Sequence, residues 1–157
     1  MRRAKTLSRK RRALDFTSCW NSFQPALNSL ADPAFFMAAT LELQPKRNLV
    51  VVRFRGHVGP SDVRRYLEEA RAALTDIQPG FRLLADLTDL ETMDVSCAPY
   101  IRQVMDLLNE KGIALVVRVI PDPTLDIGLQ IMSLFHYGHD VRIITCATLE
   151  EAMRALE

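Results

Sequence analysis

Cysteine is scarce in this 157-residue sequence, and its spacing is unsuited to cross-linking. The three cysteines, Cys19, Cys97 and Cys146, are an odd number, and no two of them have CxxC spacing. This pattern argues against a disulfide framework and a structural zinc site, and it is typical of proteins in a reducing compartment. A chain of this length needs neither, because it can bury about two-thirds of its unfolded surface. We therefore expect a cytoplasmic protein.

Long apolar runs are also absent. No uninterrupted stretch approaches the roughly 20 apolar residues that a membrane-spanning helix needs. The basic N-terminus lacks the compact apolar core of a secretory signal. With 48% hydrophobic and 25% charged residues, the composition is that of one globular domain. We expect no transmembrane segment.

Catalytic signatures are missing as well. The sequence has no P-loop, no GxGxxG motif and no HExxH motif. No nucleophile can be grouped with a base and an orienting residue. His136 and His139 have a spacing that could grip a metal on a helix, but Tyr137 and Gly138 between them indicate that the helix has already ended. We therefore expect a protein that is not an enzyme and that has no cofactor and no metal site.

Positive charge is concentrated at one end of the chain. Residues 1–12 hold seven of the 20 Lys and Arg and no acidic residue, which leaves 13 basic against 19 acidic residues, a formal charge of −6. Such a block predicts a disordered arm, although it could also hold phosphates or an anionic lipid surface. Met37 allows another interpretation, a misassigned start. We expect residues 1–36 to contribute little to the fold and residues 37–157 to form a domain that does not bind nucleic acid.

Beyond Met37, the apolar pattern predicts strands that alternate with helices. "ATLELQP" and "LVVVRFRG" indicate an antiparallel hairpin, with Val50, Val52 and Phe54 on one face. The nearly continuous apolar runs in residues 82–87 and 113–120 are typical of strands covered on both faces. A last strand is expected over residues 140–146.

Four helices are predicted, and two of them have a clear apolar stripe at helical spacing. The expected helices cover residues 60–74, 98–111 and 125–135 and a segment after Thr148, where Glu151 completes a capping box. The stripes consist of Val63, Tyr66, Leu67, Ala70 and Leu74 in the first helix and of Ile101, Val104, Met105 and Leu108 in the second. This order predicts a single α/β domain with a mainly parallel sheet, an N-terminal antiparallel hairpin and about four helices.

Two segments are expected at the carboxyl ends of the parallel strands, where sites on such sheets are favoured. One is the turn-rich stretch from Thr88 to Ala98, and the other is "PDPTLD" after the next strand. They could be neighbours in space.

The stretch "LLADLTDLETMDVS", which leads into a helix, resembles the STAS domain (sulfate transporter and anti-sigma factor antagonist). The resemblance covers roughly residues 40–156. It implies that Asp94 is the aspartate of the family's Asp-Ser-Ser-Gly-like motif and that Ser96 occupies the place of its phosphorylated serine. Val95 replaces the first serine and Cys97 replaces the glycine, while Pro99 stiffens the first helical turn.

The resemblance implies that the protein is a regulatory protein-binding module and that its partner is a regulatory protein such as an anti-sigma factor or a kinase. Ser96 is the candidate for phosphorylation. The expected partner-binding residues lie in the loop and the following helix: Thr88, Asp89, Asp94, Cys97 and Tyr100.

The residues themselves leave other interpretations of this motif open. A serine at the start of a helix can simply be its N-cap, which accepts a bond from a free backbone N–H. The same position also favours a phosphate, because the helix dipole and the unpaired N–H groups attract anions. The thiol of Cys97 could be reactive in a first helical turn, or Cys97 could be a small buried residue.

A different class of function is also open, that of a carrier or sensor of a small apolar ligand. Its cavity would be lined by Met105, Met132, Leu134 and Phe135, although methionines on helical faces often just fill a core. A carrier requires a cavity of several hundred Å³, on the order of a typical ligand pocket.

Overall fold

The structure is a computed structural model that describes residues 37–122, 124, 128–129, 132–133 and 136–157. An antiparallel hairpin lies at the beginning of the described part. β1 (Ala39–Gln44) pairs with β2 (Leu49–Phe54), and a 3-10 turn, η2 (Pro45–Arg47), joins them. Asn48 closes the turn in the left-handed conformation, with φ 47°, which asparagine tolerates better than most residues. The predicted hairpin is confirmed.

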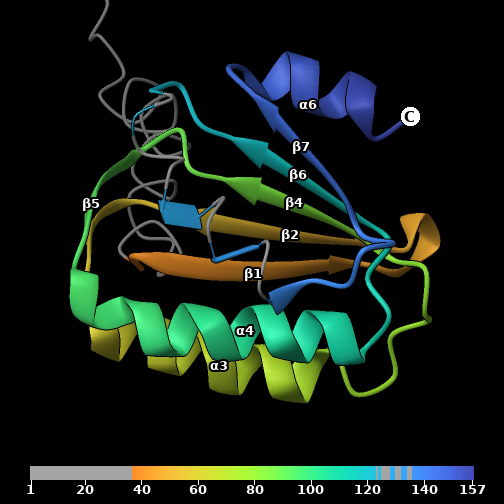
Figure 1. The fold of residues 1–157 in the computed structure, drawn as a ribbon, viewed down its shortest axis with the longest axis horizontal. Coiled ribbons are helices and arrows are strands. Elements are labelled where there is room, and N and C mark those ends of the chain that lie inside the picture. Colours follow the sequence, from red (N-terminus) through yellow and green to blue (C-terminus); the bar gives the residue numbers. More distant parts are fainter. Residues whose placement is uncertain (1–36, 123, 125–127, 130–131, 134–135) are drawn as a thin grey trace, which may run out of the picture. The chain divides into compact units, whose positions relative to one another are not determined.

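The remaining strands extend the hairpin into a five-stranded sheet of order β1-β2-β4-β6-β7. β4 (Arg82–Asp86), β6 (Leu115–Val119) and β7 (Arg142–Cys146) add to β2 in parallel (Figure 1). Residues on both faces of β6 are buried, and all of them but Arg118 are apolar, as expected of a strand covered on both sides. The mainly parallel α/β sheet that the sequence predicts is therefore confirmed.

Helices cover both faces of this sheet. α3 (Pro60–Ala73) and α4 (Ala98–Glu110) lie side by side against one face, and α6 (Leu149–Ala155) packs on β6 and β7 at the other (Figure 1). Thr148 and Glu151 form the predicted capping box of α6. The described residues contain three α-helices instead of the four expected. The fourth, over residues 125–135, falls largely on residues outside the described set.

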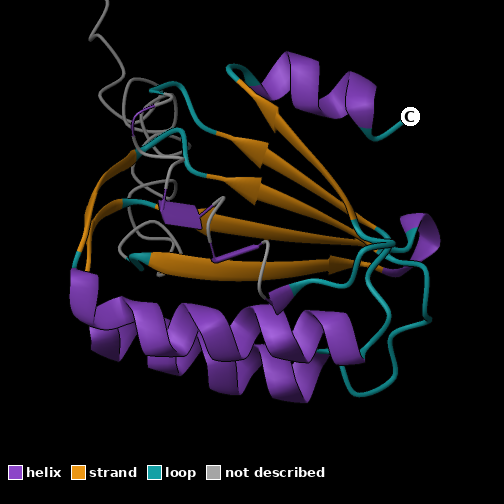
Figure 2. Cartoon of the chain, in the orientation of Figure 1, coloured by secondary structure: helices purple, strands orange, loops and turns teal. Residues whose placement is uncertain are grey.

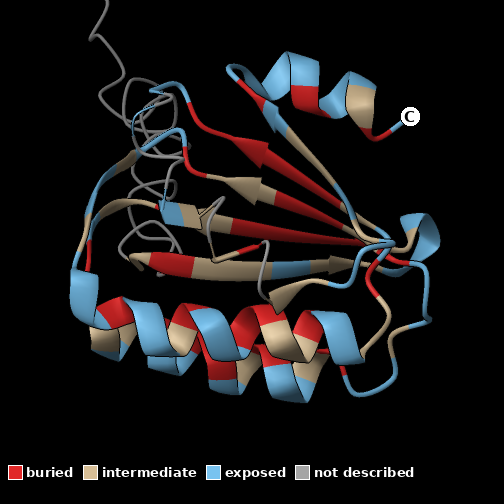
Figure 3. Cartoon of the chain, viewed as in Figure 1, coloured by how far each residue is buried: buried red, intermediate tan, exposed pale blue. Residues whose placement is uncertain are grey.

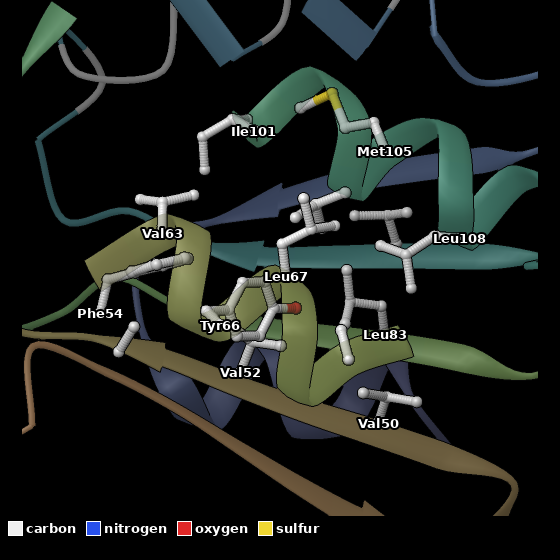
Figure 4. Packing of buried hydrophobic residues seen from close by; sticks show 14 of the residues in the cluster. Val50, Val52, Phe54, Val63, Tyr66, Leu67, Leu83, Ile101, Met105 and Leu108 are labelled. Atoms are coloured by element: carbon white, nitrogen blue, oxygen red, sulfur yellow. The ribbon is translucent and has the colours of Figure 1, made fainter. Parts of the chain in front are cut away.

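The larger part of the core lies between the sheet and the pair α3 and α4. Every residue of the two predicted apolar stripes is buried there (Figures 3 and 4). Phe54 of β2 meets Tyr66 of α3 edge to face, with ring centroids 5.6 Å apart, an arrangement that aromatic pairs favour. A smaller cluster under α6 includes Val117, Val119 and Leu156.

Two short strands were not predicted. β3 (Gly56–Val58) pairs in parallel with β5 (Leu90–Met93), so part of the expected Thr88–Ala98 loop is a strand. Figure 2 shows this ribbon between the main sheet and the beginnings of α3 and α4. Strands of three and four residues are too short to display a period. Gly56, with φ 59°, supplies the left-handed bend that turns the chain from β2 into the ribbon.

The position of Leu108 predicts a large stability effect. It is 1% exposed between α4 and the sheet, so Leu108→Ala should lower the free energy of unfolding by about 2–5 kcal/mol through lost burial and the cavity left behind. Urea denaturation measures this change. Met153→Ala on α6, where the side chain is 37% exposed, is the control and should stay within about 0.5 kcal/mol of the unchanged protein. Equal losses in the two variants would contradict this account of the core.

Candidate functional site

The two segments expected at the carboxyl ends of the parallel strands leave the sheet next to each other. β4 and β6 are neighbours with Asp86 opposite Val119, and the Leu87 N–H donates to the Val119 carbonyl at 3.0 Å. The stretch from Thr88 therefore begins beside the one that follows β6. The sheet topology thus brings the beginnings of these two segments to one edge of the sheet.

The β3–β5 ribbon fastens the Thr88–Ala98 segment to the rest of the domain. The Gly56 N–H donates to the Asp89 carbonyl at 2.8 Å, and the Asp94 N–H donates to the Val58 carbonyl at 3.0 Å. Just beyond Val58, the Gly59 N–H donates to Oδ2 of Asp62 at 3.0 Å, which caps α3. The segment is thus held at both ends of β5 and is not a free loop.

Asp94, and not Ser96, caps the helical segment that follows. Its Oδ1 accepts the Ser96 N–H at 2.8 Å and the Ser96 Oγ–H at 2.7 Å. Ser96 lies in the middle of a short 3-10 turn, η3 (Val95–Cys97), and α4 begins only at Ala98. The interpretation of Ser96 as an N-cap is therefore wrong. The physical reason is that position 96 has no N–H to cap, since the Ala98 N–H already donates to the Val95 carbonyl and Pro99 has none.

These hydrogen bonds also determine the charge at the turn. They lower the pKa of the Asp94 carboxyl, the backbone N–H of Ser96 contributing most and its hydroxyl next. Asp94 is consequently a carboxylate at neutral pH and can only accept hydrogen bonds. The Ser96 hydroxyl must then be the donor, so its lone pairs stay free on an exposed side chain.

Cys97 is buried, and its surroundings do not favour a reactive thiol. Its side chain is 1% exposed, and its Sγ lies 3.6 Å from the Val58 carbonyl oxygen. Burial, and next the charge of Asp94, raise the pKa of the thiol, whereas a reactive cysteine needs a lowered pKa. Of the two interpretations, the structure supports a small buried residue. Its burial does not favour the predicted role of Cys97 in contacting a partner.

The other expected partner-binding residues differ in exposure. Thr88 and Asp89 are exposed. Thr88 donates to Oδ1 of Asp86 through its N–H at 3.1 Å and its hydroxyl at 2.6 Å, and Asp89 pairs with Arg55 at 3.7 Å. Tyr100 is half-buried and packs against the core. Thr88 and Asp89 are accessible to a partner, whereas Tyr100 offers only part of its surface.

Val95 is the residue at this site that the sequence analysis missed. It lies between Asp94 and Ser96 and is 89% exposed, the most exposed large apolar side chain among the described residues. The signal was present in the sequence, because a valine in a turn bounded by two polar, hydrogen-bonded residues has no core to enter. We call Asp94, Val95 and Ser96 the DVS turn.

The cavity that a carrier would need is small. A space of about 60 Å³ between the sheet, α3 and α4 is lined by Met105 together with Tyr66, Ile101 and other apolar side chains. Met132 packs half-buried against the same core but does not line this space, and Leu134 and Phe135 lie outside the described residues. The volume is far below the several hundred Å³ of a typical ligand pocket, so this finding does not favour a carrier.

One wall of this cavity is formed by a charged side chain, that of Arg118. The apolar pattern of residues 113–120 did not predict that this arginine is buried. Arg118 of β6 is 4% exposed, and its Nη1 donates to Oγ of Ser133 at 3.3 Å. Ser133 in turn donates to the Leu129 carbonyl at 2.7 Å. These contacts join the segment after β6 to the sheet.

Two of the three histidines contact polar side chains, and the third, His139, is exposed. His136 Nδ1 lies 2.6 Å from Oδ1 of Asp106 on α4. His57 on β3 contacts Thr92 at 2.7 Å and Glu91 at 3.2 Å across the ribbon. Among the residues that the structure describes, no group of His, Cys, Asp or Glu could hold a metal ion.

The Asp94 carboxylate predicts a pH-dependent contribution to stability. Because its pKa is lowered in the folded chain, its contribution is complete above the ordinary carboxyl pKa and is lost as pH falls through the lower folded-state value. Asp94→Ala should therefore destabilise the protein near neutral pH, and this difference should vanish in acid. Urea unfolding of both proteins over a pH series measures it. A difference that persists at low pH would show that the charge of Asp94 does not hold the turn.

No family model matches the chain, and no curated protein matches it significantly. No helix in the described part of the chain is long and apolar enough to cross a membrane.

Solved structures, in contrast, match well. A protein of the DUF3478 family with a SpoIIAA-like fold, from Shewanella loihica, has a TM-score of 0.61 at 13% identity, over 76% of this chain and 94% of that one. The anti-sigma factor antagonist SpoIIAA in its unphosphorylated form has a TM-score of 0.54 at 22% identity, over 76% and 97%. The phosphorylated form of the Bacillus cell fate determinant SpoIIAA has a TM-score of 0.52 at 21% identity, over 76% and 100%. The resemblance read from the sequence is therefore confirmed for the fold: the chain folds like an anti-sigma factor antagonist.

Proposed function

We propose that the chain is a non-enzymatic regulatory module of the cytoplasm that binds a partner protein through the DVS turn and the adjacent Thr88 and Asp89. The observation that carries the proposal is the 89% exposure of Val95 beside the Ser96 hydroxyl. A partner that covers Val95 gains about 1.5–3 kcal/mol from its burial. It would cover Ser96 at the same time, because the two residues are adjacent.

The rigidity of the turn supports this docking role. Asp94 is held through its N–H by Val58, and its side chain holds Ser96. A surface that is already ordered loses little conformational freedom on binding, so more of the contact energy remains as affinity. An exposed apolar side chain on an ordered turn is therefore suited to an interface.

The partner that we propose is an anti-sigma factor or a kinase. This choice rests on the likeness of the fold to anti-sigma factor antagonists. The exposed Ser96 hydroxyl is the proposed phosphorylation site. One of the solved structures is of a protein in its phosphorylated form, and this supports the proposal by analogy of the fold.

Photo-crosslinking in the host tests the docking surface. A photoreactive residue in place of Val95 should capture a specific protein. The matched control places the same residue at Met153, which is also exposed but lies on α6 at the other face of the sheet. We expect a band from position 95 that is absent at position 153 and that mass spectrometry identifies as an anti-sigma factor or a kinase. The same capture at both positions, or capture at 153 alone, would contradict the proposal.

The captured partner allows the role of Ser96 to be measured. Ser96→Asp should weaken partner binding by adding charge beside Val95, whereas Ser96→Ala should keep binding and lose its regulation by phosphorylation. Val95→Ala should weaken binding about tenfold through lost apolar contact, and thermal melts should show all three variants folded. Calorimetric titration with the purified partner measures each affinity. If all of them equal that of the unchanged protein, the DVS turn is not the docking site.

A further inference from the structure

We propose that phosphorylation of Ser96 opens the DVS turn, because the phosphate displaces the Asp94 carboxylate from the donors that hold it. This inference rests on the proposed function, in that it takes Ser96 as the modified residue. It adds a mechanism: the modification would change the shape of the docking surface in addition to its charge.

Three backbone N–H groups in the turn and at the start of α4 already have acceptors. The Ser96 N–H donates to Oδ1 of Asp94 and the Cys97 N–H to the Asp94 carbonyl at 2.9 Å. The Ala98 N–H donates to the Val95 carbonyl, and Pro99 has none. A phosphate usually finds free N–H groups at a helix start. Here the carboxylate of Asp94 already occupies that place.

The chemistry of the transfer removes the second bond of the turn. The Ser96 Oγ would attack the γ-phosphorus of a nucleoside triphosphate held by the kinase. The new Oγ–P bond replaces the bond to the leaving nucleoside diphosphate, and the hydroxyl proton passes to a base of the kinase. Oγ then has no proton to donate to Oδ1 of Asp94, which lies 2.7 Å away.

Electrostatics then oppose the closed turn. The phosphate carries roughly −1.5 to −2 charges at neutral pH and stands next to an ionised carboxylate. Three basic groups of the ribbon and of α3 have acidic partners: Arg55 pairs with Asp89, His57 with Glu91, and Arg65 with Asp62 at 3.7 Å. Because Ser96 Oγ and Asp94 Oδ1 lie 2.7 Å apart in the closed turn, separation of the phosphate from the carboxylate relieves the repulsion between them.

Opening has a consequence for Val95. The same two hydrogen bonds that bind Asp94 to Ser96 fix the backbone on either side of Val95. Without them, the turn keeps only its backbone bonds, from the Cys97 N–H to the Asp94 carbonyl and from the Ala98 N–H to the Val95 carbonyl. The Val95 side chain then gains freedom, and a partner loses more conformational entropy in ordering it. Phosphorylation would thereby weaken docking even by a partner that tolerates the added charge.

The test uses the full chain with phosphoserine incorporated at position 96 and no partner. NMR follows the Asp94 carboxyl carbon through a pH titration and the hydrogen exchange of the Ser96 amide. We expect the pKa of Asp94, which is lowered in the unmodified chain, to rise on modification, and the Ser96 amide to exchange about tenfold faster or more. Ser96→Ala keeps the backbone N–H and lacks the charge, so it should leave most of that protection in place.

A second aspartate of the chain, Asp122, accepts the same two kinds of hydrogen bond and serves as a control for the titration of Asp94. Oδ1 of Asp122 accepts the Thr124 N–H at 2.9 Å and the Thr124 Oγ1–H at 2.7 Å, which lowers the pKa of Asp122 as well. Its titration should not change when Ser96 is phosphorylated. An Asp94 pKa that stays low together with unchanged Ser96 exchange would overturn the inference, since the phosphate would then point into solvent with the turn closed. Because no partner is present, these outcomes are separate from those that test docking itself.

Discussion

The parallel pairing of β2, β4 and β6 is the constraint on which the site depends. Each of these strands ends at the same edge of the sheet, so the segments that follow them must gather there. The chain uses this edge twice. After β2 it forms β3 and enters α3, and after β4 it forms β5 and enters α4. The pairing of β3 with β5 then holds the DVS turn at the entrance of α4.

In this arrangement the core stabilises the fold, whereas the candidate site lies at the surface. The stripes of α3 and α4 are buried against the sheet, and the space of about 60 Å³ that lies there is small. Cys97 marks the boundary between the two. Its thiol is buried against the Val58 carbonyl, while Val95, two residues earlier, is exposed. The turn is therefore anchored by a core residue and can present an apolar side chain without losing its shape.

The sequence predicted the long elements because their periods are clear. The stripe from Ile101 to Leu108 and the capping box from Thr148 to Glu151 are both found. It did not predict β3 and β5, which are too short to show alternation. The mistaken cap at Ser96 has a different cause, since Asp94 and Ser96 are both good caps and only geometry decides between them. The burial of Arg118 was hidden because it interrupts an otherwise apolar strand.

The central claim is that the docking surface lies at the DVS turn. It is tested most directly by identifying which residues of the purified chain the partner contacts. Backbone amide NMR signals of the chain would be recorded while the captured partner is added. The account predicts shifts concentrated in β3, in residues 88–98 and in the first turn of α4, with the signals of α6 unchanged. Shifts confined to α6, β7 or the outer edge of β1 would contradict it, because the DVS turn and the ribbon that holds it belong to none of these elements.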